Sequence, residues 1–201
     1  MKAVQKIKEV GLPNIAVGFA KRMQYARLME KYHFDAWHLS PYEWRKYMQE
    51  CARYINADKK PGGEQKTVVD IGCGLGGLLQ HIEADKRIGL DIHKEVIMAA
   101  RELGGDGIVY RKGSFEDVAE DSVDYFVTLN FMHGGTEDTW IEPYRKAAER
   151  NHVLHFMVDT VPSGGGSHFL DWERILPGNY KRTERLGPFS GGRYLEVWER
   201  Q

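Results

Sequence analysis

The stretch from Val68 to Gly77 constrains this chain more than any other. A run of β-branched residues leads to Asp70, and four glycines follow within the six residues 72–77. Glycine allows positive φ angles and lets the backbone approach a ligand closely. We expect a helix to start near Gly77, with its first amide groups facing that ligand. The layout predicts a strand, a turn and a helix that together bind a nucleotide-like molecule.

A second acidic residue, Asp91, closes the next apolar run at residues 87–91. Its distance from the glycines suits a carboxylate that accepts hydrogen bonds from ribose hydroxyl groups. We therefore expect the ligand to bind in a crevice between these two strand ends.

Composition narrows the class of protein. The chain has 201 residues, 28% of them charged, and a formal net charge of −1. This balance predicts neither a nucleic-acid nor a membrane partner. The two cysteines form no disulfide framework, so we expect a cytoplasmic protein. The histidines show no metal-ligand spacing, so no metal site is predicted.

Residues 1–63 are predicted to form an N-terminal helical segment that packs as a lid on the same domain. A helix is expected over residues 14–32, and another from Ser40, with Ser40 as N-cap and Pro41 at the first helical position. Residues 64–201 form the predicted ligand-binding domain, in which strands and helices alternate. The expected strands are 67–70, 87–91, 108–111, 123–129 and 153–158, and the expected helices are 77–84, 94–103 and 136–151, the last interrupted at Pro143.

The end of the chain breaks this alternation. Residues 180–186 and 194–200 have the composition of strands, and the seven residues between them are too few for a helix. We therefore expect an antiparallel hairpin at the edge of a mainly parallel α/β sheet.

The pattern Gly-x-Gly-x-x-Gly, met by Gly72, Gly74 and Gly77, also occurs in nicotinamide-dependent enzymes. Three features argue against that interpretation. Asp70 would repel a pyrophosphate, a long helical segment precedes the first strand, and the sheet ends in an antiparallel hairpin.

The sequence Asp70-Ile71-Gly72-Cys73-Gly74-Leu75-Gly76, with Asp91 closing the next strand, resembles the first two motifs of class I S-adenosylmethionine-dependent methyltransferases. The resemblance covers residues 67–200 in strand order and is strongest at 68–77. It implies a Rossmann-like, seven-stranded, mostly parallel sheet whose antiparallel last strand lies beside the fifth. S-adenosylmethionine would be the cofactor and S-adenosylhomocysteine the product.

The resemblance also implies roles for individual residues. Asp70 would hold the cofactor's ammonium group and Asp91 its ribose hydroxyls. Ser114 stands where the family usually has an acid that meets the adenine amine, and Phe115 would stack on or flank that ring, while Glu116 or Asp117 could substitute for the acid. The predicted cofactor-binding residues are Asp70, Gly72, Cys73, Gly74, Gly76, Asp91, Ile92, Ser114, Phe115 and Asn130.

Two residues are candidates for catalysis. His133 follows the fourth strand in a segment that resembles the family's fourth motif, and it would act as a general base or pack against the adenosine. Asp159 closes the fifth strand and would orient a base, bind the acceptor or cap a turn. Trp37 and His38 could contact the methionyl end or the acceptor, although core packing is the favoured interpretation of Trp37.

The sequence thus predicts methyl transfer to an oxygen or nitrogen of a small-molecule or metabolite acceptor. No motif specifies the acceptor or the oligomeric state. Three alternatives stay open: an NAD(P)-dependent oxidoreductase, an aminopropyl transferase that uses the decarboxylated cofactor, and a non-catalytic protein that binds S-adenosylmethionine.

Overall fold

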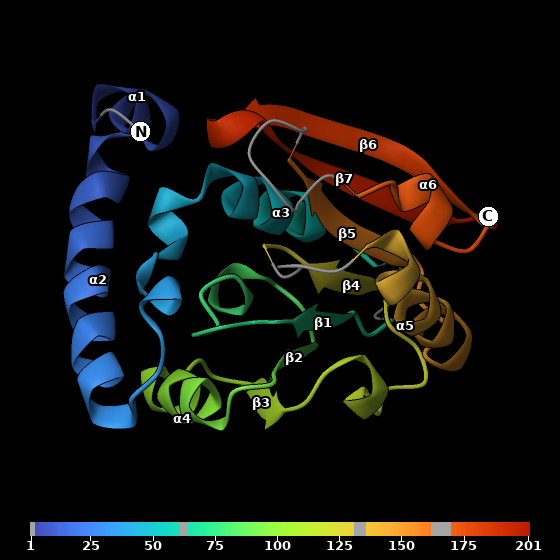
Figure 1. The fold of residues 1–201 in the computed structure, drawn as a ribbon, viewed down its shortest axis with the longest axis horizontal. Coiled ribbons are helices and arrows are strands. Elements are labelled where there is room, and N and C mark those ends of the chain that lie inside the picture. Colours follow the sequence, from blue (N-terminus) through green and yellow to red (C-terminus); the bar gives the residue numbers. More distant parts are fainter. Residues whose placement is uncertain (1–2, 61–63, 131–135, 162–169) are drawn as a thin grey trace.

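A computed structural model describes residues 3–60, 64–130, 136–161 and 170–201. Its centre is a seven-stranded sheet (Figure 1). The strands are β1 (Thr67–Ile71), β2 (Lys86–Asp91), β3 (Ile108–Lys112), β4 (Tyr125–Thr128), β5 (His155–Thr160), β6 (Tyr180–Phe189) and β7 (Arg193–Arg200).

The strand order is β3-β2-β1-β4-β5-β7-β6. Strands β1 to β5 pair in parallel, whereas β7 lies antiparallel between β5 and β6. The predicted hairpin and the predicted place of the last strand are therefore confirmed. Because parallel strands end at the same edge, Asp70 in β1 and Asp91 in β2 reach one rim of the sheet.

Helices cover both faces of the sheet. They are α1 (Ala3–Val10), α2 (Leu12–Tyr32), α3 (Lys46–Ala57), α4 (Lys94–Leu103), α5 (Glu137–Arg150) and α6 (Trp172–Ile175), with single 3₁₀ turns η1 (Ala36–Leu39), η2 (Tyr42–Trp44), η4 (Leu79–His81), η5 (Phe115–Asp117) and η6 (Ser190–Gly192). Side chains alternate between the faces of each strand. Val68 and Tyr125 accordingly pack with α3 and α4, and Val69 and Phe126 pack with α5 and α6.

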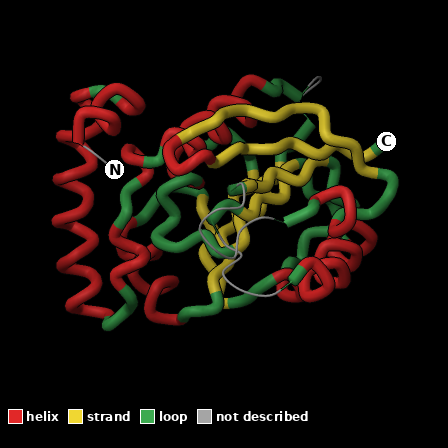
Figure 2. Tube along the Cα trace, turned by 45° about the horizontal axis from the view of Figure 1, so that its top comes forward, coloured by secondary structure: helices red, strands yellow, loops and turns green. Residues whose placement is uncertain are grey.

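The long helix α2 lies beside the sheet, with loops and short helical turns between them (Figure 2). A small core joins it to the rest of the molecule: Tyr25 and Leu28 of α2 pack with Leu75 of the glycine turn and Val96 of α4. Gly18 of α2 lies against the indole ring of Trp44 so closely that a Cβ would clash with it. The N-terminal helices are thus attached to the chain around the glycine turn.

Three local predictions are wrong. No helix starts at Ser40, whose hydroxyl accepts a hydrogen bond from Arg45 Nε at 3.2 Å; η2 intervenes and α3 begins at Lys46. The predicted helix 77–84 is reduced to η4. There the Arg87 guanidinium donates to the carbonyl oxygens of Leu79 and Ile82. These two carbonyl groups therefore do not need the amide partners that a longer helix would provide.

The third wrong prediction is a break at Pro143, because α5 is continuous through this residue. A proline inside a helix costs about 3 kcal/mol through its missing N–H and its steric clash. The turn that follows buries Tyr144, Ala147 and Ala148 against the sheet, which offsets that cost. Within the described ranges, no helix is long and apolar enough to cross a membrane.

Candidate functional site

A cavity of about 690 Å³ lies at the carboxyl ends of β1, β2 and β4. Two walls enclose most of it. We call residues 70–78 and 91–93 the glycine wall, and residues 35–48 the helical wall. The lining residues are Tyr25, Asp35, Trp37, His38, Ser40, Tyr42, Arg45, Met48, Asp70, Gly72, Cys73, Gly74, Leu75, Gly77, Leu78, Asp91, Ile92, His93, Leu129, Asn130 and Trp140.

The glycine turn takes its shape from β2. The amide groups of Gly72 and Cys73 both donate to the carbonyl oxygen of Leu90, at 2.8 and 3.0 Å. The amide of Gly74 donates to Asp91 Oδ2 at 3.1 Å. Gly74 has a φ of 54°, and a Cβ there would lie 3.3 Å from Nδ1 of His38, so a side chain would enter the space that His38 occupies. Three amide groups of the turn are therefore already bonded within the protein.

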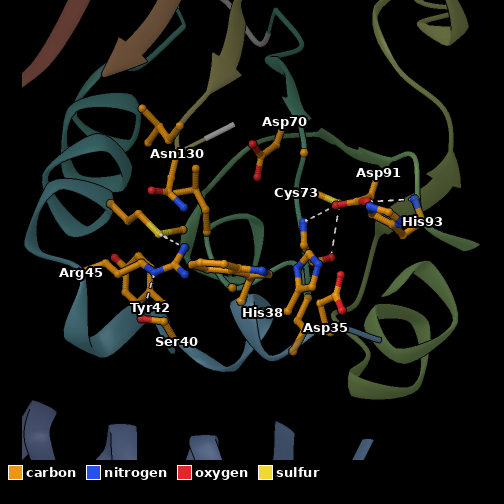
Figure 3. A pocket seen from close by; sticks show the side chains of 18 of the residues that line it. Asp35, His38, Ser40, Tyr42, Arg45, Asp70, Cys73, Asp91, His93 and Asn130 are labelled. Carbon is orange, nitrogen blue, oxygen red and sulfur yellow. Dashed lines mark hydrogen bonds between the residues drawn. The ribbon is translucent and has the colours of Figure 1, made fainter. Parts of the chain in front are cut away.

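Asp91 is only 5% exposed, and the protein holds both of its carboxylate oxygens. Oδ2 accepts from Gly74, and Oδ1 accepts from the amide of His93 at 3.0 Å (Figure 3). A carboxylate has about four acceptor positions. Asp91 can therefore accept two further hydrogen bonds from vicinal hydroxyl groups without losing its support.

Asp70 is buried at the end of β1 and its carboxyl group enters the cavity (Figure 3). Burial, and secondly the neighbouring Asp91, raise the pKa of Asp70 to about 8, and Arg45 acts in the opposite direction. An acid in this position is stabilised as a carboxylate by a bound cation. A ligand ammonium group would provide that cation.

The helical wall brings a different chemistry to the cavity. Trp37 is 84% exposed although it lines the cavity, so the expectation that it packs in the core is wrong. The ring of Tyr42 is stacked on His81 with 3.8 Å between the ring centroids. Burial lowers the pKa of His38, which keeps its imidazole neutral near pH 7.

The structure brings most of the predicted cofactor residues together. Seven of them line the cavity: Asp70, Gly72, Cys73, Gly74, Asp91, Ile92 and Asn130. Gly76, Ser114, Phe115 and Asp159 are not among the residues that line it. His133, the first candidate base, lies outside the described residues.

Each of the displaced residues has another visible role. Gly76 faces the phenol of Tyr110, where a Cβ would clash. Ser114 caps η5. The ring of Phe115 is buried in the core, with centroid distances of 5.3 Å to Phe126 and 5.0 Å to Tyr144, instead of flanking an adenine site in the cavity.

Asp159, predicted as catalytic, does not line the cavity but contacts Asn130, which does. Its carboxylate forms an ion pair with Arg193 and accepts the amide of Asn130 at 2.8 Å. Arg193 also donates to Oδ1 of Asn130 at 3.0 Å, and Asn130 has a φ of 55°. The structure thus assigns Asp159 to holding Asn130 at the cavity wall.

The sequence did not predict Arg45 and Trp140 as lining residues of the cavity, nor Arg193 as the partner of Asp159 and Asn130. Trp37 carried a usable signal, because it lies in a segment without helical or strand periodicity and so belongs to no core stripe. Arg193 carried none, since only the pairing of β7 with β5 brings it to Asp159.

The domain and the fold around this site have similar counterparts among known proteins. Residues 69–156 match the family profile described as methyltransferase domain. No curated protein sequence matches the chain. Among solved structures, magnesium protoporphyrin IX methyltransferase (ChlM) from Synechocystis PCC 6803 with bound S-adenosylhomocysteine is similar, with a TM-score of 0.63 at 11% identity over 98% of each chain.

The mitomycin 7-O-methyltransferase MmcR is also similar, with a TM-score of 0.58 at 16% identity over 87% of this chain and 60% of the other. LepI in complex with S-adenosylmethionine is similar with a TM-score of 0.59 at 12% identity, over 75% of this chain and 46% of the other. At such identities the likeness shows the fold. The profile match over residues 69–156 adds a likeness to methyltransferase domains. The similar ChlM structures contain S-adenosylhomocysteine or S-adenosylmethionine.

Proposed function

We propose that this protein transfers the methyl group of S-adenosylmethionine to an oxygen or nitrogen atom of a small-molecule acceptor. The observation that carries the proposal is the meeting of Asp70, Asp91 and the glycine turn at one cavity. These groups suit the ammonium group, the ribose hydroxyls and the close backbone contact of such a cofactor.

The same geometry disfavours a dinucleotide. A pyrophosphate needs free amide groups at a helix N-terminus. Here the amides of Gly72, Cys73 and Gly74 are bonded to Leu90 and Asp91, and only the short η4 follows the turn. Asp70 at the same rim would add repulsion. An NAD(P)-dependent reaction is therefore not supported.

The acceptor side of the cavity favours a small, largely apolar molecule. Trp37, Tyr42 and Met48 of the helical wall line it together with Leu129 and Trp140. Sites for small molecules are concave and mostly apolar with few polar groups. The names of the similar MmcR and ChlM also describe enzymes that act on small molecules. A cytoplasmic location stays a sequence-based prediction.

The cofactor would supply an electrophilic methyl group on a sulfonium: the acceptor's lone pair would form a bond to the methyl carbon as the carbon–sulfur bond breaks, and the sulfur would leave as a neutral thioether. The protein's part is to orient the partners and exclude water. Asp70 would hold the ammonium group of the cofactor and Asp91 its ribose hydroxyls, and the aromatic side chains of the helical wall would shield the reacting atoms. Removal of a proton by His133 remains a proposal.

Calorimetry with S-adenosylhomocysteine, NAD and NADP tests this assignment. We expect binding of S-adenosylhomocysteine alone. Asp91→Ala should weaken it at least ~10-fold, because charge-assisted hydrogen bonds contribute ~1.5–3 kcal/mol each. Binding of NAD without S-adenosylhomocysteine would contradict the proposal.

Methyl transfer is tested in an experiment separate from cofactor binding. Isotopically labelled S-adenosylmethionine is incubated with the protein and a fractionated metabolite extract. Label in a low-molecular-weight product supports the proposed acceptor class, and label in protein or nucleic acid contradicts it. Binding without any transfer would favour the non-catalytic alternative.

A further inference from the structure

The N-terminal part of the chain carries a charge opposite to that of the rest. Seven of the 28 lysine and arginine residues, but only two of the 29 acidic residues, lie within residues 1–33. This segment therefore has a formal charge of +5, and residues 34–201 have a formal charge of −6. The net charge of −1, from which no membrane partner is expected, hides this asymmetry. A basic segment on an acidic body favours binding to an anionic surface.

The outer side of α2 is apolar over the first half of the helix. The side chains of Leu12, Phe19 and Met23 are 65%, 58% and 64% exposed. Their spacings of seven and four residues place all three on one side of the helix. Gly18 and Tyr25, on the other side, are buried, and α2 lies at the edge of the molecule (Figure 1). A helix with apolar residues on both sides normally has both sides covered, so we expect a partner on the outer one.

Positive charge accompanies this apolar surface. The charged residues of α2 are Lys21, Arg22, Arg27, Lys31 and the single acid Glu30. Arg27 lies one turn beyond Met23 on the same side of the helix, and Lys8 belongs to the adjoining α1. Both Lys8 and Arg27 are exposed and form no ion pair within the described ranges, whereas Lys31 pairs with Glu102. We call Lys8, Leu12, Phe19, Met23 and Arg27 the outer patch.

Charge and polarity together select the occupant of the outer patch. A second copy of the chain would bring another segment of charge +5 against the first, and like charges oppose such a contact. Nucleic acid would attract the cations but would leave the apolar side chains in water. An anionic bilayer satisfies both, because its headgroups attract lysine and arginine while the boundary with the acyl chains accepts apolar side chains.

We propose that the outer patch binds the surface of an anionic lipid bilayer, with α2 lying in the plane of the headgroups. The only residue of α2 in the lining of the cavity is Tyr25, which faces the opposite way from the outer patch. A bilayer on the outer side would therefore leave the cavity uncovered. The proposal goes beyond the methyl transfer proposed above, and it is tested without any cofactor.

The test measures co-sedimentation of the full chain with lipid vesicles. One set contains about 30% phosphatidylglycerol in phosphatidylcholine, and the other contains phosphatidylcholine alone. The wild-type protein should bind the anionic vesicles at least ~10-fold more tightly than the neutral ones at ~0.1 M salt. This preference should shrink at ~1 M salt, where the Debye length falls to about 3 Å.

Two double variants separate the two contributions. Leu12→Gln with Met23→Gln removes exposed apolar side chains, and it should lower the affinity for anionic vesicles at least ~10-fold. Lys8→Glu with Arg27→Glu reverses two charges and should lower it by a similar factor. Thermal unfolding of each variant should match the wild type, because the replaced side chains are exposed.

Matched controls make the same chemical changes elsewhere on the surface. Lys86→Glu with Lys181→Glu changes the net charge equally on β2 and β6, and Met98→Gln replaces an exposed methionine of α4. Charges farther from a surface than a Debye length of about 10 Å are screened. These controls should therefore keep the vesicle affinity within about threefold of the wild type.

Several outcomes would overturn the proposal. One is equal binding to neutral and anionic vesicles, or none at all. Another is an equal loss in the outer-patch variants and in the controls, which would place the contact elsewhere. Binding to heparin as tight as to vesicles, and unchanged by Leu12→Gln with Met23→Gln, would indicate a polyanion as the partner. A dimer in solution that the same variant converts to a monomer would assign the outer patch to a second copy.

Discussion

The two walls of the cavity differ in what forms them: backbone hydrogen bonds in the glycine wall and side chains in the helical wall. In the glycine wall, short-range bonds fix the backbone, as when Gly74 and His93 donate to Asp91. In the helical wall, side chains provide the chemistry on short helical turns that tertiary packing holds in place. A glycine whose Cβ would clash, such as Gly76 against Tyr110, accepts few substitutions, whereas an exposed side chain such as Trp37 can be exchanged. The cofactor end of such a cavity is therefore the constrained one, and the acceptor end is free to vary.

Arg193 connects the helical wall to Asn130 and Asp159 at the ends of β4 and β5, and its removal should have the largest effect. It pairs with Asp159, donates to Asn130 and lies over the ring of Tyr47 in α3, 4.6 Å from its centroid. Arg193→Ala leaves the half-buried Asp159 carboxylate without its cation, which we expect to destabilise the fold by about 3 kcal/mol. Denaturant unfolding measures this.

The control for Arg193 is the double variant with Asp159→Asn, which removes the orphaned charge. It should recover part of the lost stability. If both variants unfold at the same denaturant concentration as the wild type, the contacts of Arg193 with Asp159 and Asn130 do not stabilise the fold.

A side chain added to the glycine wall should lower the stability of the protein. Gly76 and Gly104 have nearly equal φ angles of 75° and 76°, but a Cβ at Gly76 would clash with Tyr110 while Gly104 has open space around it. Gly76→Ala should cost about 2 kcal/mol more than Gly104→Ala, because both positions have a positive φ and only Gly76 adds an overlap with Tyr110. Equal losses in thermal unfolding would refute this.

Asp70 makes the cofactor end dependent on pH. Its pKa is raised from 3.8 to about 8 in the folded protein, so the folded state holds a proton that the unfolded state loses above about pH 4. Stability should therefore fall as pH rises from about 4 to about 8, and Asp70→Asn should remove this slope from the thermal unfolding temperature.

Binding should respond to pH in the opposite direction. Since the ammonium group needs a carboxylate, affinity for S-adenosylhomocysteine should rise about tenfold between pH 6 and pH 7. In Asp70→Asn the affinity should be weaker and independent of pH. A wild-type affinity that does not change with pH would contradict the role of Asp70.

Trp37 should show the smallest effect on stability. Exposed side chains away from packed features usually change stability by less than ~0.5 kcal/mol when replaced. Trp37→Ala should therefore melt like the wild type and bind S-adenosylhomocysteine with nearly the same affinity. A large loss of stability would place Trp37 among the packed residues after all, and the contrast between the walls would weaken.

Much of the fold could be predicted from the sequence, because the strands are local runs of apolar residues and the glycine turn is a contiguous motif. The acids Asp70 and Asp91 were found for the same reason. Local spacing does not reveal which way a side chain faces, so Phe115 was expected at the adenine and lies in the core.

Other features depend on residues that are remote in the chain. The helix expected at 77–84 is replaced by a short turn whose carbonyls bind Arg87 of the next strand. Asp159 resembles a catalytic acid until Arg193, from the last strand, neutralises it. The helical wall has no motif at all, since its side chains meet only after α2 and α3 have packed.

The place of Arg193 in the chain has a consequence for synthesis. Residues 35–48 and 70–93 leave the ribosome first, but the loop that carries Asn130 is fastened by residue 193 of 201. A nascent chain therefore completes its ligand-binding cavity only when nearly all of these residues have been translated. Since a ligand that binds only the folded state stabilises it, the cellular cofactor pool would protect finished chains from degradation and leave prematurely terminated ones to the proteases.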